Sequence, residues 1–90
     1  MNNSIWYVYL VRCKNNALYC GITNNLENRL KIHNSGKGSK SCIAHGLPVK
    51  LVWSREVSDM SNALKLESTI KKLSKKIKEQ LVTGGYGIIE

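Results

Sequence analysis

The chain lacks several features that define other classes of protein. No apolar run approaches the ~18 residues that a membrane-spanning helix needs. The apolar stretch Ile5–Val11 has no basic region before it and no small-residue cleavage site after it, so it is predicted to be a strand rather than a signal peptide. We therefore expect neither a membrane protein nor a membrane partner.

Cysteine is scarce and unevenly spaced. The three cysteines, Cys13, Cys20 and Cys42, include no C-x-x-C pair. An odd number without that spacing argues against a disulfide framework and against a zinc cage. Because free thiols persist most easily in a reducing compartment, we expect the protein to be cytoplasmic.

Signatures of other catalytic sites are also missing. No G-x-x-x-x-G-K-[ST] motif is present, and Gly36-Lys37-Gly38 is too short to replace one, so no nucleotide cofactor is expected. Neither His33 nor His45 is placed to form a recognisable zinc or triad motif with a cysteine or a serine.

Acidic residues are few, and some segments have none. The chain has 14 Lys or Arg against 6 Asp or Glu, which gives a formal net charge of +8. Residues 28–55 and 71–78 contain basic side chains and no acid. Phosphate backbones are the commonest target of such a surface, which predicts nucleic acid as a partner. A solubilising charged face and an amphipathic membrane-surface helix are the alternatives.

Length and composition predict one small globular domain. Apolar residues make up 42% of the 90 residues and charged residues 22%, which is typical of a folded domain. A chain of this length buries only ~60–65% of its unfolded surface, so the core is modest. We expect a single domain over residues 1–90, with a core over about 5–82 and a loose tail over 83–90 after Gly84-Gly85.

Local patterns predict the order β-β-α-β-α-α. Residues 5–13 and 17–23 are rich in aromatic and β-branched side chains, which favour strands. Thr23-Asn24-Asn25 can cap a helix that continues to about Asn34. Residues 35–48 are expected to be a polar loop, and residues 49–57 a third strand. This order predicts an α/β (α+β) fold with a small three-stranded, mainly antiparallel sheet flanked by helices.

The last segment has apolar residues at helical spacing throughout. They are Ala63, Leu66, Ile70, Leu73, Ile77 and Leu81. Ser58, Asp59 or Ser61 can cap this helix at its start. Ser74 can restart it, so one bent helix and two short helices are both open.

The hairpin turn decides which tyrosines share a face of the sheet. A two-residue turn at Asn15-Asn16 would put Tyr9 and Tyr19 on opposite faces. A three-residue turn, closed by Asn16 in the left-handed conformation, would pair Tyr9 with Gly21 and Val11 with Tyr19. Tyr7, Tyr9 and Tyr19 would then share a face. We predict the three-residue turn, although strand tyrosines serve packing more often than catalysis.

Three polar residues on the helices are candidate site residues. Arg29 and His33 share a helical face with Leu26 and Leu30, where an arginine is unusual because it is rarely buried without a partner. The planar guanidinium of Arg29 suits phosphate oxygens. The alternative for Arg29 is a side chain that reaches past the edge of the sheet to solvent, and the alternative for His33 is a cation placed favourably near a helix C-terminus. Glu67 lies at the margin of the apolar stripe, where it either pairs with Lys71 or points into a site.

These residues resemble the GIY-YIG nuclease superfamily. Tyr7-Val8-Tyr9 and Tyr19-Cys20-Gly21 are similar to the two halves of its signature, with Tyr7 and Cys20 in place of its first Gly and second Ile. Arg29 follows Tyr19 at the same ten-residue spacing that separates Tyr19 from Tyr9. Glu67 matches the family's metal-binding glutamate, and His33 the histidine one turn after the arginine.

The likeness is closest to the small single-domain bacterial branch of that superfamily. Gly36-Lys37-Gly38 resembles its GKG-type loop, and Pro48–Val52 its proline-led third strand. The segment Ile70–Ser74 and Lys78 resemble its tail. Relatives often carry an aromatic residue, a Thr and an Arg after the GKG segment, where this chain has Ser41-Cys42-Ile43.

The resemblance implies a metal-dependent endonuclease that hydrolyses phosphodiester bonds in DNA, with structured or damaged DNA as candidate substrates. Glu67 would hold one divalent metal ion, Mg²⁺ or Mn²⁺, and Tyr9 or Tyr19 would help take the proton from the attacking water. Arg29 would steady charge on the phosphate, and His33 would orient water or relay a proton. The lysines expected to hold the backbone are Lys37, Lys40, Lys71, Lys72, Lys75 and Lys76.

Two other functions compete with the nuclease hypothesis. One is a non-catalytic or weakly active nucleic-acid-binding module of the same fold, and the other is a protein-interaction domain whose tyrosines serve packing. An unidentified protein partner that supplies specificity is compatible with each of them. The nuclease hypothesis expects Tyr9, Tyr19, Arg29 and Glu67 to converge on one concave patch.

Overall fold

A computed structural model describes residues 5–84 of the chain. Strands β1 (Trp6–Arg12), β2 (Leu18–Thr23) and β3 (Lys50–Val57) form one antiparallel sheet in the order β2-β1-β3. The helices are α1 (Leu26–Asn34), α2 (Lys40–His45), α3 (Met60–Lys71) and α4 (Lys75–Val82). The predicted α+β fold with a three-stranded antiparallel sheet is confirmed.

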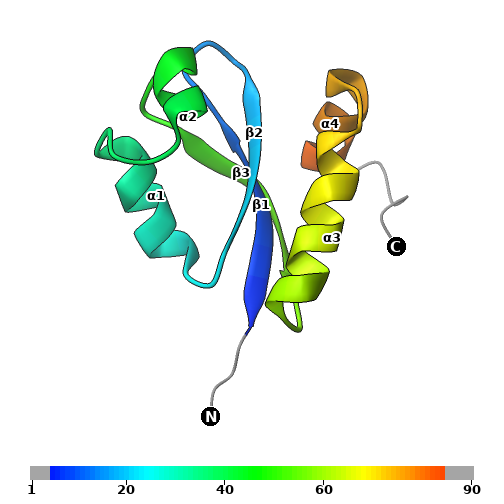
Figure 1. Ribbon diagram of the computed structural model, residues 1–90. Helices are drawn as coiled ribbons and strands as arrows, with labels where there is room; N and C mark the ends of the chain where they lie inside the picture. The colour runs from blue at the N-terminus through cyan, green and yellow to red at the C-terminus, as the bar shows by residue number, and fades with distance from the viewer. Residues whose placement is uncertain (1–4, 85–90) are drawn as a thin grey trace.

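The molecule has three layers, with the sheet in the middle. Figure 1 shows α1 and α2 on one face of the sheet and α3 and α4 on the other. Side chains alternate along a strand, so the central strand β1 supplies both faces. Val8 and Leu10 face α3, whereas Tyr9 and Val11 face α1, and all four are at most 1% exposed.

Two separate cores result from this alternation. The α3-side core consists of Val8, Leu10, Cys20, Ala63, Ile70 and Leu81. The α1-side core consists of Tyr9, Val11, Cys13, Cys42 and Val49. The apolar stripe of the last segment therefore packs where its helical spacing predicted, against the sheet.

The hairpin has the three-residue turn predicted from its sequence. Asn16 has φ 78°, in the left-handed region, and the Cys13 amide donates to the Ala17 carbonyl at 2.8 Å. In the resulting register Tyr9 pairs with Gly21 and Val11 with Tyr19. Tyr9 and Tyr19 consequently lie on the same face of the sheet, the face covered by α1.

Ser74 decides between one bent helix and two short ones. Its hydroxyl accepts from the Ile77 amide at 3.3 Å and caps α4, after α3 has ended at Lys71 with Lys72 as its C-cap. Asp59, one of three predicted candidates, caps α3 by accepting from the Asn62 amide at 2.8 Å. The last segment is thus two helices.

The loop predicted over residues 35–48 is wrong at its centre. Lys40–His45 form α2, which Ser39 caps by accepting from the Ser41 amide at 3.1 Å. A six-residue helix has too few hydrogen bonds to form through propensity alone. Its fully buried Cys42 anchors it to the sheet, and that tertiary contact leaves no periodic trace in the sequence.

The ends of this segment are held by backbone geometry. Gly46 has φ 103°, a conformation that favours glycine, and the peptide bond Leu47–Pro48 is cis.

Most of the tail predicted over residues 83–90 lies outside the described residues. Within residues 5–84, no helix has the length and apolar character needed to cross a membrane.

Candidate active site

Tyr9 is the centre of a buried polar cluster. Its hydroxyl oxygen lies 2.9 Å from Nε2 of His33, and Nε of Arg29 donates to the same oxygen at 3.4 Å. Tyr9 is 1% exposed and His33 is fully buried, whereas Arg29 is partly exposed. The cluster therefore reaches solvent through the arginine.

Tyr19 joins this cluster from the neighbouring strand. Its ring meets the His33 ring edge-on, with centroids 5.5 Å apart, and the Tyr9 ring meets the same imidazole at 6.0 Å. The Arg29 guanidinium also interacts with the Tyr19 phenol. Tyr9, Tyr19, Arg29 and His33 are thus brought together by β1, β2 and α1.

Helix α1 is positioned by polar contacts at both ends. Asn25 caps it by accepting from the Asn28 amide at 3.0 Å. At the other end, Asn34 accepts from the Val49 amide at 2.7 Å and donates to the Val49 carbonyl at 3.3 Å. Arg29 and His33 lie one turn apart between these anchors, so both side chains point at Tyr9.

Gly21 is required by the position of the Tyr9 ring. A Cβ at Gly21 would lie 2.5 Å from the Tyr9 hydroxyl oxygen and 2.7 Å from Cζ. Such distances are well inside van der Waals contact, so any larger residue would displace the ring. The glycine of the second half-signature therefore makes room for the tyrosine of the first.

Gly38 makes a similar close approach to His33. A Cβ there would lie 2.8 Å from Nδ1 and 2.9 Å from Cα of the histidine. Nδ1 has no hydrogen-bond partner among the described residues. The GKG-type segment thus passes directly over the imidazole.

The direction of the hydrogen bond between Tyr9 and His33 depends on the tautomer of the imidazole. With the lone pair on Nε2, the imidazole accepts from the Tyr9 O–H while the Tyr9 oxygen accepts from Arg29, and Nδ1 is the nitrogen left without a partner among the described residues. With the proton on Nε2, the Tyr9 O–H would be left without an acceptor among them. Burial, followed by the Arg29 charge, lowers the pKa of His33, which is consistent with a neutral imidazole.

The same burial opposes ionisation of Tyr9. Desolvation raises the pKa of Tyr9, and the Arg29 hydrogen bond only partly offsets that effect. Arg29 in turn has its pKa raised, chiefly by the hydrogen bond to Tyr9. In this state the cluster holds a neutral phenol against a guanidinium cation.

Glu67 occupies a different position from these four residues. It belongs to α3, which packs on the opposite face of the sheet, and its charge contributes to raising the pKa of Cys20, after desolvation, to about 12. Because β2 is the edge strand, the carboxylate approaches the tyrosines only around that edge. No hydrogen bond or ion pair among residues 5–84 joins it to the cluster, and its convergence with the tyrosines stays a prediction.

The ion pair expected as the alternative for Glu67 is formed. The carboxylate lies 3.3 Å from Nζ of Lys71, and the glutamate side chain is 17% exposed. Within residues 5–84, no group of three His, Cys, Asp or Glu side chains could hold a metal ion by itself. Glu67 fits an ion that takes one carboxylate and completes its shell with waters and phosphate oxygens, as Mg²⁺ commonly does.

The six lysines predicted to hold nucleic acid are all exposed, in two groups. Lys37 and Lys40 lie beside the C-terminal end of α1, and the others lie along α3 and α4. Two of the second group already have partners: Lys71 pairs with Glu67, and Lys75 lies 3.1 Å from Glu79. Lys72 and Lys76 have no such partner in the described part of the chain.

Three residues that support the cluster were not among the predicted site residues. Gly21, Gly38 and Asn34 act through close approach or backbone hydrogen bonds, as described above. The two glycines lie inside segments that the sequence analysis singled out, Tyr19-Cys20-Gly21 and Gly36-Lys37-Gly38. Glycine is required at both positions because of a tertiary contact, which the sequence does not show. Asn34 carried no signal beyond its place next to His33.

Known proteins share both the sequence and the fold. A family model described as the GIY-YIG catalytic domain matches residues 5–80. A UPF0213 protein of Vibrio cholerae serotype O1 is 56% identical over 82 residues, which cover 90% of this chain and 80% of that protein. The UPF0213 protein YhbQ of Escherichia coli is 45% identical over 85 residues, covering 94% of this chain and 84% of that protein.

A solved structure is similar as well. The solution NMR structure of a UPF0213 protein from Bacillus halodurans superposes with a TM-score of 0.56 at 38% sequence identity. The match covers 88% of this chain and 83% of that chain. The name UPF0213 specifies neither a substrate nor a metal.

Proposed function

The chain belongs to the GIY-YIG domain family, a nuclease superfamily, and from this we propose that it is an endonuclease that hydrolyses phosphodiester bonds in DNA with one divalent metal ion. One observation carries the proposal. The Tyr9 oxygen lies within reach of both His33 Nε2, at 2.9 Å, and Arg29 Nε, at 3.4 Å. A buried tyrosine that served packing alone would need one partner for its hydroxyl, whereas Tyr9 has both an imidazole and a guanidinium.

Arg29 is the group that we assign to the scissile phosphate. Its Nε is engaged with Tyr9, and the guanidinium is partly exposed at the edge of the cluster. A planar fork held at one nitrogen presents its remaining donors in a fixed direction, which suits two phosphate oxygens. Charge that develops on those oxygens during hydrolysis would be stabilised there.

The two tyrosines have different access to water, which divides their roles. Tyr9 is 1% exposed, so its oxygen serves to orient Arg29 and His33. Tyr19 is only half-buried, and it is the phenol that we expect to meet the attacking water and accept its proton. His33, in contact with both rings, would hold the two phenols in their relative orientation.

Glu67 is the residue that we assign to a divalent ion, Mg²⁺ or Mn²⁺. When bound, the ion supplies Lewis-acid stabilisation of charge on the phosphate and leaving oxygens. A carboxylate that binds the ion must release Lys71, which lies 3.3 Å away on the next turn. Lys71 is then available to the DNA backbone.

A cleavage assay with matched variants tests the proposal. Duplex, branched and damaged DNA would be incubated with Mg²⁺ or Mn²⁺ and wild type, Arg29→Ala or Glu67→Gln. Controls are Lys31→Ala and Lys65→Ala, exposed residues of the same two helices. We expect each site variant to lower the cleavage rate by about 10²–10³-fold and each control to retain it. Cleavage that neither site variant alters would disprove the assignment.

One observation favours a second function, a nucleic-acid-binding module without activity. Glu67 is engaged by Lys71, and it belongs to α3, which packs on the face of the sheet opposite α1. Binding that weakens steeply with salt, without products under any metal, would support this function. For either function we place the protein in the cytoplasm, on the strength of its three buried free thiols.

A further inference from the structure

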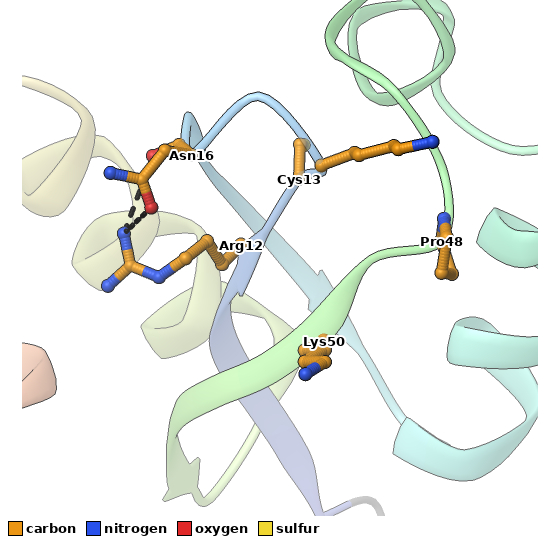
Figure 2. A pocket seen from close by; sticks show the side chains of 6 residues that line it. Arg12, Cys13, Asn16, Pro48 and Lys50 are labelled. Carbon is orange, nitrogen blue, oxygen red and sulfur yellow. Dashed lines mark hydrogen bonds between the residues drawn. The ribbon is translucent and has the colours of Figure 1, made fainter.

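A cavity lies at the hairpin end of the sheet, and none of Tyr9, Tyr19, Arg29 and His33 lines it. It has a volume of about 280 Å³ and is lined by Arg12, Cys13, Lys14, Asn16, Pro48 and Lys50. Figure 2 shows Arg12 and Asn16 on one side of it and Pro48 and Lys50 on the other. These residues come from the end of β1, the turn and the start of β3.

The walls of this cavity are fixed by backbone contacts. The Lys14 amide donates to the Gly46 carbonyl at 3.0 Å, and the Asn15 amide donates to the His45 carbonyl at 3.1 Å. A Cβ at Gly46 would lie 2.9 Å from Cβ of Lys14, so only glycine allows this approach. The turn is therefore docked on the end of α2, which fixes the backbone at this side of the cavity.

Arg12 lines the cavity, but its positive charge is already paired. Its guanidinium makes two hydrogen bonds to Glu79, at 2.7 and 2.8 Å, and another to Asn16 at 3.2 Å. In Figure 2 it points toward Asn16, away from Pro48. The arginine charge is thus neutralised by a carboxylate outside the cavity.

Lys14 and Lys50 are the unneutralised charges. Both are exposed, no acidic side chain lines the cavity, and neither lysine has an anionic partner within residues 5–84. Two cations beside one cavity attract an anion. The volume is slightly below the ~300–1,000 Å³ of small-molecule sites, so it suits a group of the size of a phosphate with its waters.

The position of the cavity relates it to the tyrosine cluster. Tyr9 and Arg12 lie three residues apart on β1, which corresponds to about 10 Å at ~3.3 Å per residue. The end of β1 that lines the cavity is therefore close enough for a nucleic acid bound at the cluster to reach it.

We propose that the cavity lined by Lys14, Asn16 and Lys50 binds a backbone phosphate of the nucleic acid, separate from the phosphate held at Tyr19 and Arg29. The identity of the ligand as nucleic acid depends on the proposed function, whereas the affinity of the cavity for phosphate does not. Such a contact fixes the direction in which the strand runs along β1. Contacts of this kind position a protein without reading sequence.

Salt-dependent binding of duplex DNA tests this proposal, measured in EDTA so that cleavage plays no part. The variants are Lys14→Gln, Lys50→Gln and the double variant, and Lys65→Gln on α3 is the charge-matched control for the single variants. The double variant should reduce the slope of log K against log salt by about 0.9, the value for one phosphate contact, and each single variant should reduce it by less. The control should keep the slope of the wild type.

A second arm distinguishes DNA from free phosphate. Amide NMR signals of residues 14–16 and 50 would be followed during titration with inorganic phosphate and with a duplex. Shifts of these signals by the duplex, lost in the double variant, support the proposal. Shifts by inorganic phosphate alone, with an unchanged salt slope, or no shifts by either ligand, would overturn it. If the salt slope changed in the variants but the protein never cleaved DNA, the nuclease proposal would be wrong and the proposal for this cavity would still hold.

Discussion

The two faces of the sheet share one central strand but are built from different chemistry. Val8 and Leu10 point into an aliphatic core against α3, which Ile70 and Leu81 complete. Tyr9, the residue between them, points into a core that contains a buried histidine and an arginine. The α3 side thus gains free energy by simple burial, whereas the α1 side buries polar groups that must satisfy one another.

This difference separates stability from function. A buried polar cluster with one unpaired nitrogen, His33 Nδ1, is costly, and an apolar core of the same volume would serve folding better. The α1 side retains the cluster because it places two phenols and a guanidinium together. Burial of apolar side chains on the α3 side offsets the free-energy cost of this cluster.

The largest expected effect is on the stability of the α3 side. Ile70 is fully buried, and Ile70→Ala should lower the free energy of unfolding by about 2–5 kcal/mol. Leu64→Ala, an exposed position of the same helix, should change it by less than about 0.5 kcal/mol. Urea unfolding measures both values. DNA cleavage per folded molecule should survive Ile70→Ala, and a loss of activity in fully folded variant would contradict the separation of the two faces.

A smaller effect on stability, joined to a loss of function, is expected on the α1 side. Tyr9→Phe removes the hydrogen-bond partner that His33 Nε2 has among residues 5–84 and leaves a buried imidazole without a hydrogen bond there. The cost should be about 1–3 kcal/mol in urea unfolding, together with a fall in the cleavage rate. Tyr7→Phe is the matched control, since Tyr7 lies on the same strand and is only half-buried. If the two variants lost stability and cleavage rate to the same extent, the hydrogen-bonded cluster around Tyr9 would have no special role.

The smallest effect concerns the ionic contact that fastens α4 to the hairpin. Hydrogen bonds from Arg12, then from Lys75, lower the pKa of Glu79 to about 2, below its usual ~4.3. The stabilisation is therefore present above about pH 5 and is lost as the pH falls through about 2. Because the carboxylate side chain is 32% exposed, we expect at most about 1 kcal/mol.

Stability curves against pH measure this last contribution. Glu79→Gln should be less stable than the wild type at pH 7, and the difference should shrink as the pH approaches 2. Glu56→Gln, an exposed residue of β3, is the control. A difference that persists unchanged in acid would show that the contact acts through packing rather than charge.

Features with a local cause could be predicted from the sequence. The register of the hairpin follows from the tolerance of Asn16 for the left-handed conformation, and the break at Ser74 from its capping hydroxyl. The cluster of Tyr9, Tyr19, Arg29 and His33 followed from that register and from helical spacing. For the turn and for the break at Ser74 the deciding interaction lies within a few residues, whereas the contacts of the cluster span 20 and 24 residues.

Features that depend on tertiary approach could not be predicted. The helix over Lys40–His45 exists because Cys42 reaches the sheet, and Gly38 is needed because the chain passes over His33. A helical wheel placed Glu67 at the edge of an apolar stripe, but it does not state which face of the sheet that stripe covers. The face is set by the path of the chain after β3, which crosses to the side opposite α1.

The two hydrogen bonds between the Asn34 side chain and the Val49 backbone have a consequence for the order of folding. Its partners are 15 residues apart in the chain, whereas Arg12 and Glu79 are 67 residues apart. Closing the longer loop costs about 1.3 kcal/mol more in chain entropy than closing the shorter one. We therefore expect the half that carries the tyrosine cluster to assemble early and the C-terminal helices to dock onto it afterwards.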